Sequence, residues 1–294
     1  MAHDLTSTTG PEHDMGVIDA PQWLPAAWAR SARAIGATAS AEEIDEVGTT
    51  LVASWSEPGR FHHNLKHLVD VLARIDELAQ ETHAPDVVRV AGWYHGVVFS
   101  AGSHVAYKHR GGEDPVASAE RARRELTDLG VADDVVERIA RLVSGVDRHS
   151  ADIRDIDAQA LNDADLATLA VEPQKYAAYR KAVREEYAHI PVRDYLTHRI
   201  AILTKLLARP SLFSSPMAQG WEEPARENVT AELSRLQSEL RALPPDEPSE
   251  GAAEGEPAGE GATSPAEAPR PRRLSPDHAD PDSGEGTLSR PPPR

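Results

Sequence analysis

Apolar residues recur every three or four positions through most of the chain between residues 21 and 243. In the segment 64–81 this spacing joins four leucines and Ile75 into one stripe, which predicts an amphipathic helix. Ser40, followed by acidic residues, marks another helix start. No alternating strand with a hairpin signal is present. We therefore expect an all-α domain of roughly eight to ten helices, with helical segments at 21–37, 40–55, 64–81, 87–99, 114–130, 132–146, 155–170, 173–189, 192–208 and 221–243.

The composition changes abruptly near residue 244. From there to residue 294 the chain is mostly Pro, Glu, Gly, Ala and Ser, and it holds no aromatic residue. Such a segment cannot bury enough apolar surface to offset the entropy lost on ordering, so we expect 244–294 to be a disordered tail. Residues 1–20 are expected to be a flexible N-terminus. The folded domain is then expected to cover 21–243.

Composition also limits the possible chemistry. The chain has no cysteine, so any metal site must use His, Asp, Glu or water. A net charge of −17 argues against non-specific binding to nucleic acid. No apolar run approaches the roughly 18 residues that a membrane span needs. Because the first residues also lack the pattern of a secretory signal, we expect no membrane association and a cytoplasmic protein.

One histidine lies inside the apolar stretch "RVAGWYHGVVFS". Winding 87–99 as a helix places His95 between Val88 and Ala91, on an apolar arc that faces the protein interior. Two interpretations follow from the residues alone. His95 is either a core histidine bonded to a carbonyl group or a ligand that points into a site.

Three further histidines surround a predicted helix start in "GRFHHNLKHL". Asn64 is a good N-cap, which places His63 just before the helix and His67 in its first turn. A rigid helix start is a suitable place from which to aim ligands. His62 is interpreted as part of a polar loop.

An acidic residue on a buried stripe is the next candidate. In "QALNDADLATLA", helical winding places Asp165 on the leucine arc and Asp163 outside it. A buried carboxylate is costly unless it pairs with a cation or binds a metal, so the alternatives are an ion pair with an arginine or a metal site. His149 stands at a predicted helix end shortly before. Histidines and one acid without cysteine suit a divalent ion with imidazole and carboxylate ligands.

Taken in order, several stretches resemble those of the HD-domain superfamily of metal-dependent phosphohydrolases. The resemblance covers about residues 45–240 and is strongest to a branch of predicted phosphohydrolases with no settled substrate. It implies an HD-domain-like helical bundle that hydrolyses a small phosphate ester or a nucleotide. The stretches are "EPGRFHHNLKHL", "VAGWYHGVVF", "ASAERA", "LNDADLATLA", "YAAYRKAVREEYAHI" and "ARENVTAEL".

The resemblance also implies roles for individual residues. It implies a divalent ion, Mn, Mg, Fe, Co or Zn, held by His63, His95, Asp165 and Glu113. It implies that proton transfer or phosphate binding involves His67, His149 and Arg184. Weaker candidates for holding the phosphate are Lys108, Arg110 and Arg180, for most of which a position on a solvated charged face is the better explanation.

The sequence departs from the family at the residue after His95. The family has an aspartate that ligates the metal there, and this chain has Gly96. Glu113, Asp114 or His149 could supply the lost carboxylate or ligand, and an aspartate restored at position 96 is expected to tighten metal binding. Within a helix the glycine would also cost about 0.8–1 kcal/mol relative to alanine.

Two other interpretations therefore stay open. The first is an HD fold that has lost catalysis and binds a nucleotide or a protein partner. The second is a helical bundle without a small-molecule site, which would leave the buried acid unexplained.

Overall fold

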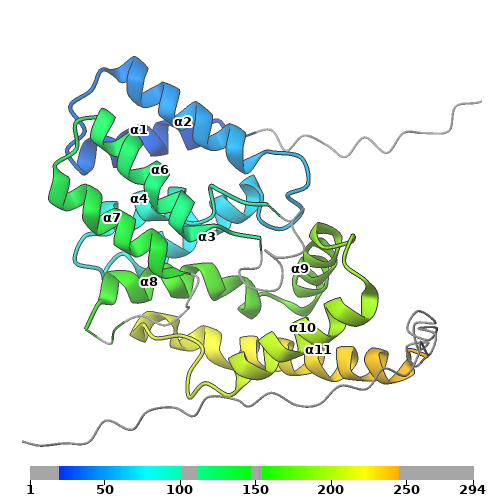
Figure 1. Cartoon of the computed structure of the whole chain (residues 1–294). Coiled ribbons are helices and arrows are strands. Elements are labelled where there is room, and N and C mark those ends of the chain that lie inside the picture. Colours follow the sequence, from blue (N-terminus) through cyan, green and yellow to red (C-terminus); the bar gives the residue numbers. More distant parts are fainter. Residues whose placement is uncertain (1–19, 101–111, 147–151, 153, 245–294) are drawn as a thin grey trace, which may run out of the picture. The chain divides into compact units, whose positions relative to one another are not determined.

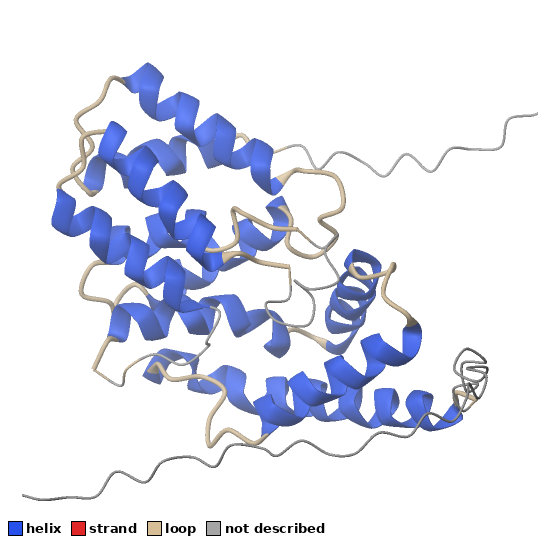
Figure 2. Ribbon diagram, in the orientation of Figure 1, coloured by secondary structure: helices blue, strands red, loops and turns tan. Residues whose placement is uncertain are grey.

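The computed structural model describes residues 20–100, 112–146, 152 and 154–244. This part of the chain is helical throughout and holds ten α-helices and two short 3-10 helices, which confirms the predicted fold class (Figures 1 and 2). The β interaction found in it is an isolated antiparallel bridge between Phe99 and Glu113.

The helices follow the predicted segments closely. Their bounds are α1 Leu24–Ala34, α2 Ala41–Trp55, α3 Leu65–Leu78, α4 Pro85–Tyr94, α6 Pro115–Asp128, α7 Asp133–Gly145, α8 Ile156–Leu166, η2 Ala167–Ala170, α9 Pro173–Glu186, α10 Val192–Leu207, η3 Pro216–Trp221 and α11 Glu222–Ala242.

Side-chain caps explain where several of these helices begin. Ser40 and Glu43 form a reciprocal capping box at the start of α2. Asn64 accepts hydrogen bonds from two backbone N–H groups at the start of α3, as the sequence predicts. Asp114 and Asp155 cap α6 and α8 in the same way. Side-chain caps therefore hold the starts of α3 and α8, which carry His67 and Asp165, whereas α4 begins without one.

The first hydrophobic core lies among α1 to α4, α6 and α7, with one face of α8. Its largest side chains are aromatic and fully buried. Trp28 meets Trp93 edge to face at 5.5 Å between ring centroids, and its indole N–H donates to the Ile44 carbonyl oxygen at 2.8 Å. Trp55 donates to the Trp93 carbonyl oxygen at 3.0 Å. These contacts fix α4, which carries His95 at its end, against α1 and α2.

A second core forms among η2, α9, α10 and α11. A buried ion pair crosses it, in which Arg199 Nε donates to Glu232 Oε1 at 3.0 Å and Tyr176 donates to the same carboxylate. Helix α8 takes part in both cores, because Leu161 packs in the first and Ala160 in the second. Figure 1 shows α8 between α7 and the α10–α11 pair.

Helix α4 ends earlier than the sequence pattern indicates. It stops at Tyr94, and His95 is its C-cap residue, still with helical dihedral angles. The prediction that His95 points inward is confirmed, since only 2% of the residue is exposed. The helix predicted over 87–99 is wrong beyond that point. Gly96 therefore lies outside the helix, and the helix cost expected for this glycine does not apply.

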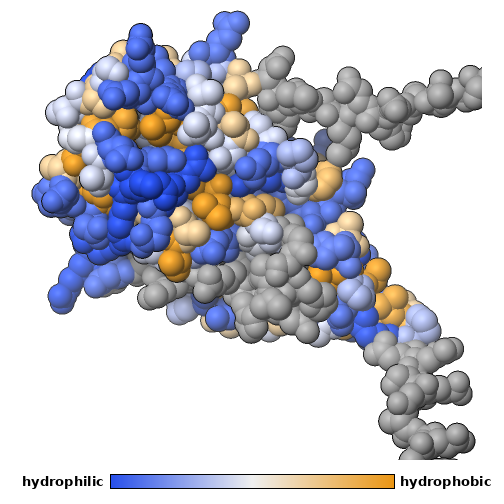
Figure 3. Space-filling view, turned by 45° about the horizontal axis from the view of Figure 1, so that its top comes forward, coloured by the Kyte–Doolittle hydropathy of each residue, from blue (hydrophilic) through white to orange (hydrophobic). Residues whose placement is uncertain are grey.

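The surface of the described residues is mixed. On the face shown in Figure 3, hydrophilic residues predominate and hydrophobic ones are interspersed between them. Five large hydrophobic residues among the described ones are exposed, and two of them belong to α10; they are Trp23, Val116, Val192, Ile202 and Met217. Among the described helices, none combines the length and the apolar character that crossing a bilayer requires.

Some predictions concern residues outside the described part. The flexible N-terminus and the disordered tail fall almost wholly on 1–19 and 245–294, and they stay predictions. The same holds for the candidate residues Lys108, Arg110 and His149.

Candidate functional site

Three side chains with metal-binding atoms converge beneath the first turn of α3. His67 Nε2 lies 3.2 Å from His95 Nε2 and 3.3 Å from Asp165 Oδ1. His95 Nε2 lies 3.8 Å from the same carboxylate oxygen. The three residues come from α3, the end of α4 and α8, so the site forms only where these elements pack together.

The protonation of His95 follows from its surroundings. Its Nδ1 lies 2.6 Å from the Gly92 carbonyl oxygen, which can only accept, so Nδ1 carries the proton. Burial lowers the pKa of His95 to about 4, although Asp165 opposes this shift. The ring is therefore neutral near pH 7, and Nε2 presents a lone pair to the other two side chains.

His67 is held by packing on its neighbours. Its ring contacts Trp55, His62 and His95, with centroid distances of 6.1, 4.7 and 5.3 Å. Its Nδ1 is buried and finds no hydrogen-bond partner among the described residues. The orientation of Nε2 toward Asp165 thus depends on the shape of the surrounding core.

The three atoms are spaced as ligands of one metal ion would be. His67, His95 and Asp165 are the described residues whose ligand atoms form such a group. Metal–ligand distances of about 2.0–2.2 Å place adjacent ligand atoms about 3.0–3.5 Å apart in octahedral or tetrahedral geometry. The observed separations of 3.2, 3.3 and 3.8 Å are close to this range. The residues present fit a divalent ion, and two histidines with one carboxylate leave coordination positions open.

This candidate set differs from the one that the resemblance implied. It includes His67, for which the resemblance implied a catalytic role, and it does not include His63 or Glu113. His63 lies beside the group, with its ring centroid 5.7 Å from that of His67. Its Nδ1 meets Glu186 Oε2 at 2.8 Å, and its Nε2 lies 3.9 Å from Glu113 Oε1.

Glu186 fixes the loop that precedes α3. Its side chain is fully buried, and its Oε1 accepts from the backbone N–H groups of both His62 and His63 at 2.7 Å. Burial disfavours a charge on His63, but the carboxylates of Glu186 and Glu113 prevail and raise its pKa to about 9. Burial alone would raise the pKa of Glu186, but the charge and hydrogen bond of His63 prevail and lower it. His63 is therefore a charged donor in the metal-free protein.

Glu113 occupies the space beside Gly96. A Cβ atom added at Gly96 would lie 2.8 Å from Glu113 Oε1 and 2.9 Å from Trp55 Cη2. The β-bridge to Phe99 brings Glu113 to this position. A carboxylate from another segment of the chain thus lies beside Gly96.

Arg60 connects the backbone segments that carry His63 and His95. Its Nη1 donates to the carbonyl oxygens of His63 and Gly96 at 3.0 and 2.9 Å. Its Nη2 donates to the Val97 carbonyl oxygen at 2.8 Å. The guanidinium also lies over the rings of Trp55 and Phe99. Arg60 therefore sets the distance between the two segments.

The structure corrects the burial that helical winding predicted for Asp163 and Asp165, the first and last residues of "DAD". Asp163, placed outside the buried arc by helical winding, is only 1% exposed, whereas the Asp165 side chain is 11% exposed. Helix α8 is buried on several faces because it lies between two cores. Asp163 accepts hydrogen bonds from the backbone N–H groups of Ser214 and Ser215 at 2.6–3.0 Å. Burial nevertheless raises its pKa to about 6.

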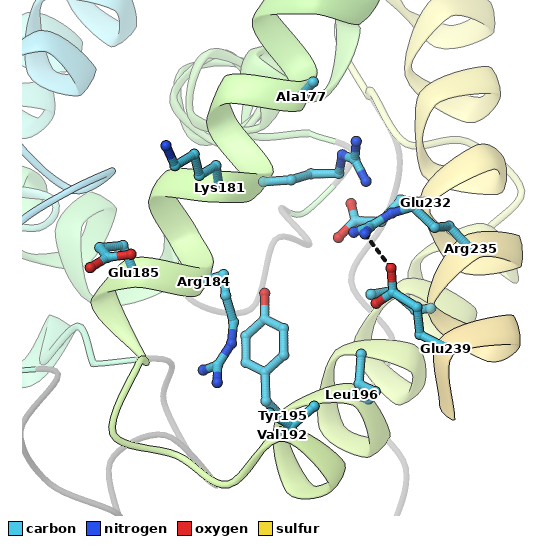
Figure 4. Close-up of a pocket in the computed structure, with 12 residues that line it drawn as sticks. Ala177, Lys181, Arg184, Glu185, Val192, Tyr195, Leu196, Glu232, Arg235 and Glu239 are labelled. Carbon is cyan, nitrogen blue, oxygen red and sulfur yellow. Dashed lines mark hydrogen bonds and ion pairs between the residues drawn. The ribbon is translucent and has the colours of Figure 1, made fainter. Parts of the chain in front are cut away.

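Arg184 has a different place from the one expected. Its guanidinium donates to the carbonyl oxygens of Tyr187 and Ile190 and stacks over the Tyr195 ring, 4.6 Å from its centroid. It lines a cavity of about 370 Å³ between α9, α10 and α11 (Figure 4). None of the three converging residues lines that cavity. Arg184 thus stabilises the end of α9 at a distance from the candidate metal group.

Sequence reasoning missed three contributors to the site. Nothing in the local sequence pattern distinguishes Glu186 from the neighbouring Glu185. Arg60 lies two residues before His62, and this proximity to the histidines was the available signal. His62, interpreted as a loop residue, packs between His67 and Tyr179 at 4.7 Å from each ring. Burial and the nearby charges of His63 and His67 hold its pKa well below the ordinary value.

Comparison of the chain with protein-family models, curated proteins and solved structures finds no match.

Proposed function

We propose that the protein is a metal-dependent phosphohydrolase of the HD type that acts on a small phosphate ester. The convergence of His67 Nε2, His95 Nε2 and Asp165 Oδ1 carries this proposal. A divalent ion bound there would polarise a phosphoryl oxygen and lower the pKa of water. The HD resemblance of the sequence supports the proposal for His95 and Asp165, which it also implied as metal ligands, whereas it implied His63 in the place that His67 takes here.

The surrounding residues have separate tasks in this proposal. Neutral His95 presents its Nε2 lone pair because Gly92 holds the Nδ1 proton. Charged His63, held by Glu186, is placed to donate a hydrogen bond to a phosphate oxygen or a proton to the leaving alkoxide. Arg60 keeps the backbone of His63 near Gly96. The chain thereby orients both a metal group and an adjacent donor.

The second carboxylate of the proposed site is Glu113. Its Oε1 lies 2.8 Å from the position that a Cβ atom at residue 96 would take, and 3.9 Å from His63 Nε2. On this account Gly96 leaves room for Glu113.

Metal analysis and phosphatase assays test the proposal. Protein purified without chelator and without a nickel column should contain, or take up from Mn²⁺ solution, close to one ion per chain. It should then hydrolyse a generic phosphate monoester. His67→Gln should lose both properties, whereas His189→Gln, which changes an exposed histidine, should keep both. Absence of metal uptake by the folded wild-type chain would refute the proposal.

A binding module is the second candidate function. Gly96 favours it, because the family's doublet aspartate is missing. Metal uptake without turnover of any phosphate ester, together with retention of the intact ester, would support this alternative.

A further inference from the structure

A cavity of about 490 Å³ opens between α3, α8 with η2, and α9. His62 and His67 lie on its wall, so the cavity and the candidate metal group share the side chain of His67, although His95 and Asp165 do not line the cavity. A molecule held at the metal group by its phosphate would extend its organic part into this space. The chemistry of the walls therefore bears on the kind of substrate.

Small apolar and aromatic side chains form one part of the walls, and polar or charged side chains, among them Lys66, Asp70 and Lys175, form the rest. Ala164 and Ala167 face Ala178 and Ala182 of α9, and Phe61 and Tyr179 add two rings. Such a surface gains free energy by excluding water from apolar groups. It fits a compact hydrocarbon or aryl group.

Polar groups on the walls are largely engaged within the protein. The Asn64 side chain caps α3, and the Tyr179 hydroxyl accepts a hydrogen bond from Arg199 Nη2 at 3.1 Å. The cations at the rim face nearby acids, as in the pair between Arg74 Nη1 and Glu77 Oε2 at 2.7 Å. A ribose or a base edge placed here would bury hydroxyl and amide groups with few partners, which is unfavourable.

We propose that this cavity binds the apolar organic part of a phosphate monoester and thereby selects alkyl or aryl phosphates over nucleotides. The inference rests on the proposed function for the position of the phosphate. It goes further by naming the chemical class of the substrate and the surface that selects it.

Phosphonates of increasing chain length test the cavity without any turnover. Dissociation constants of methyl-, butyl- and hexylphosphonate and of AMP are measured by calorimetry on the full chain, with and without Mn²⁺. Affinity should rise with chain length by up to about fourfold per buried methylene. The gain should be similar with and without metal, because it arises in the cavity. AMP should bind more weakly than hexylphosphonate.

Two neighbouring alanines of α9 provide a matched pair of variants. Ala178→Leu fills the cavity wall and should abolish the gain from methyl- to hexylphosphonate. Ala177→Leu changes the adjacent residue, which faces the other cavity (Figure 4), and should leave the gain unchanged. A chain that binds no Mn²⁺ but keeps the chain-length dependence would refute the phosphohydrolase and retain the cavity proposal. Tighter binding of AMP, or a gain that Ala178→Leu does not reduce, would overturn the cavity proposal.

Discussion

Asp163 and Asp165 are two residues apart in α8 but have different partners. Asp165 faces His67 and His95, whereas Asp163 accepts backbone hydrogen bonds from the segment before η3. An asparagine at position 165 removes a charged ligand and keeps the volume. An asparagine at position 163 replaces one of the two acceptor oxygens with an NH₂ group, which cannot accept from the backbone N–H groups of Ser214 and Ser215. The two changes should therefore separate metal binding from stability.

We expect Asp165→Asn to weaken Mn²⁺ binding by more than the 10–100-fold that loss of a supporting group commonly costs. Its melting temperature without metal should change little. Asp163→Asn should keep metal affinity and lower the free energy of unfolding by about 1–3 kcal/mol. Calorimetric titration and thermal unfolding measure both quantities. The opposite assignment of effects would show that Asp163 is the functional acid.

Gly96 and Glu113 should behave as a coupled pair. Because a Cβ at position 96 would come within 3 Å of Glu113 and Trp55, Gly96→Ala should displace the carboxylate and destabilise the protein by about 1–3 kcal/mol. In a Glu113→Gln background the same change should affect Mn²⁺ affinity less than in wild type. Thermal unfolding and metal titration of all four proteins measure the coupling.

A second glycine provides the control for this cycle. A Cβ added at Gly145 meets nothing within 4 Å, so Gly145→Ala should be neutral or stabilising by up to about 1 kcal/mol. Strictly additive effects of Gly96→Ala and Glu113→Gln would mean that a side chain at position 96 disturbs Trp55 and not Glu113.

Gly96→Asp should also fail to tighten metal binding, contrary to the expectation from sequence, because the Glu113 carboxylate already lies next to position 96.

The helices could be predicted from the sequence because the residues that determine each of them lie within or next to it. The leucine stripe of α3, the Asn64 cap and the serine before α2 each lie within a few residues of the structure that they determine. The end of α4 at Tyr94 was not predictable, since its apolar run continues to Phe99. The burial of α8 on several faces was also not predictable, because it depends on packing against two cores. Likewise, Glu186 meets His63 only through the docking of α9.

The start of α8 should give the site region a dependence on acidic pH. Asp155 caps α8 and forms two hydrogen bonds with Arg138, at 2.5 and 2.7 Å. The bond to Arg138 lowers the pKa of Asp155 below 3.8. The stabilisation is therefore present above the ordinary pKa and is lost as pH falls through the lowered value.

We expect Asp155→Asn to be less stable than wild type near pH 7, by no more than about 1 kcal/mol because the pair is partly exposed. The difference should shrink as the pH falls below 3.8. Urea unfolding at several pH values measures it. A difference that stays constant down to pH 2 would mean that the carboxylate charge contributes nothing.

At the scale of the whole molecule, the described residues between 20 and 244 form one compact unit with two hydrophobic cores. The side chains that line both cores come from residues 20–244. A chain that ends at Pro244 should therefore keep the helical circular dichroism and the melting temperature of the full chain. A clear decrease in either would show that later residues are needed for stability.

The hydrogen bond between His63 and Glu186 joins residues 123 positions apart in the sequence. Closing a loop of that length costs entropy before the contact forms, and distant contacts slow folding. The helices of the first core have nearer partners and can assemble earlier. We therefore expect His63 to acquire its orientation in a late folding step, after α9 has docked. A metal ion present during refolding should then accelerate the early phases little, and its main effect should be to slow unfolding.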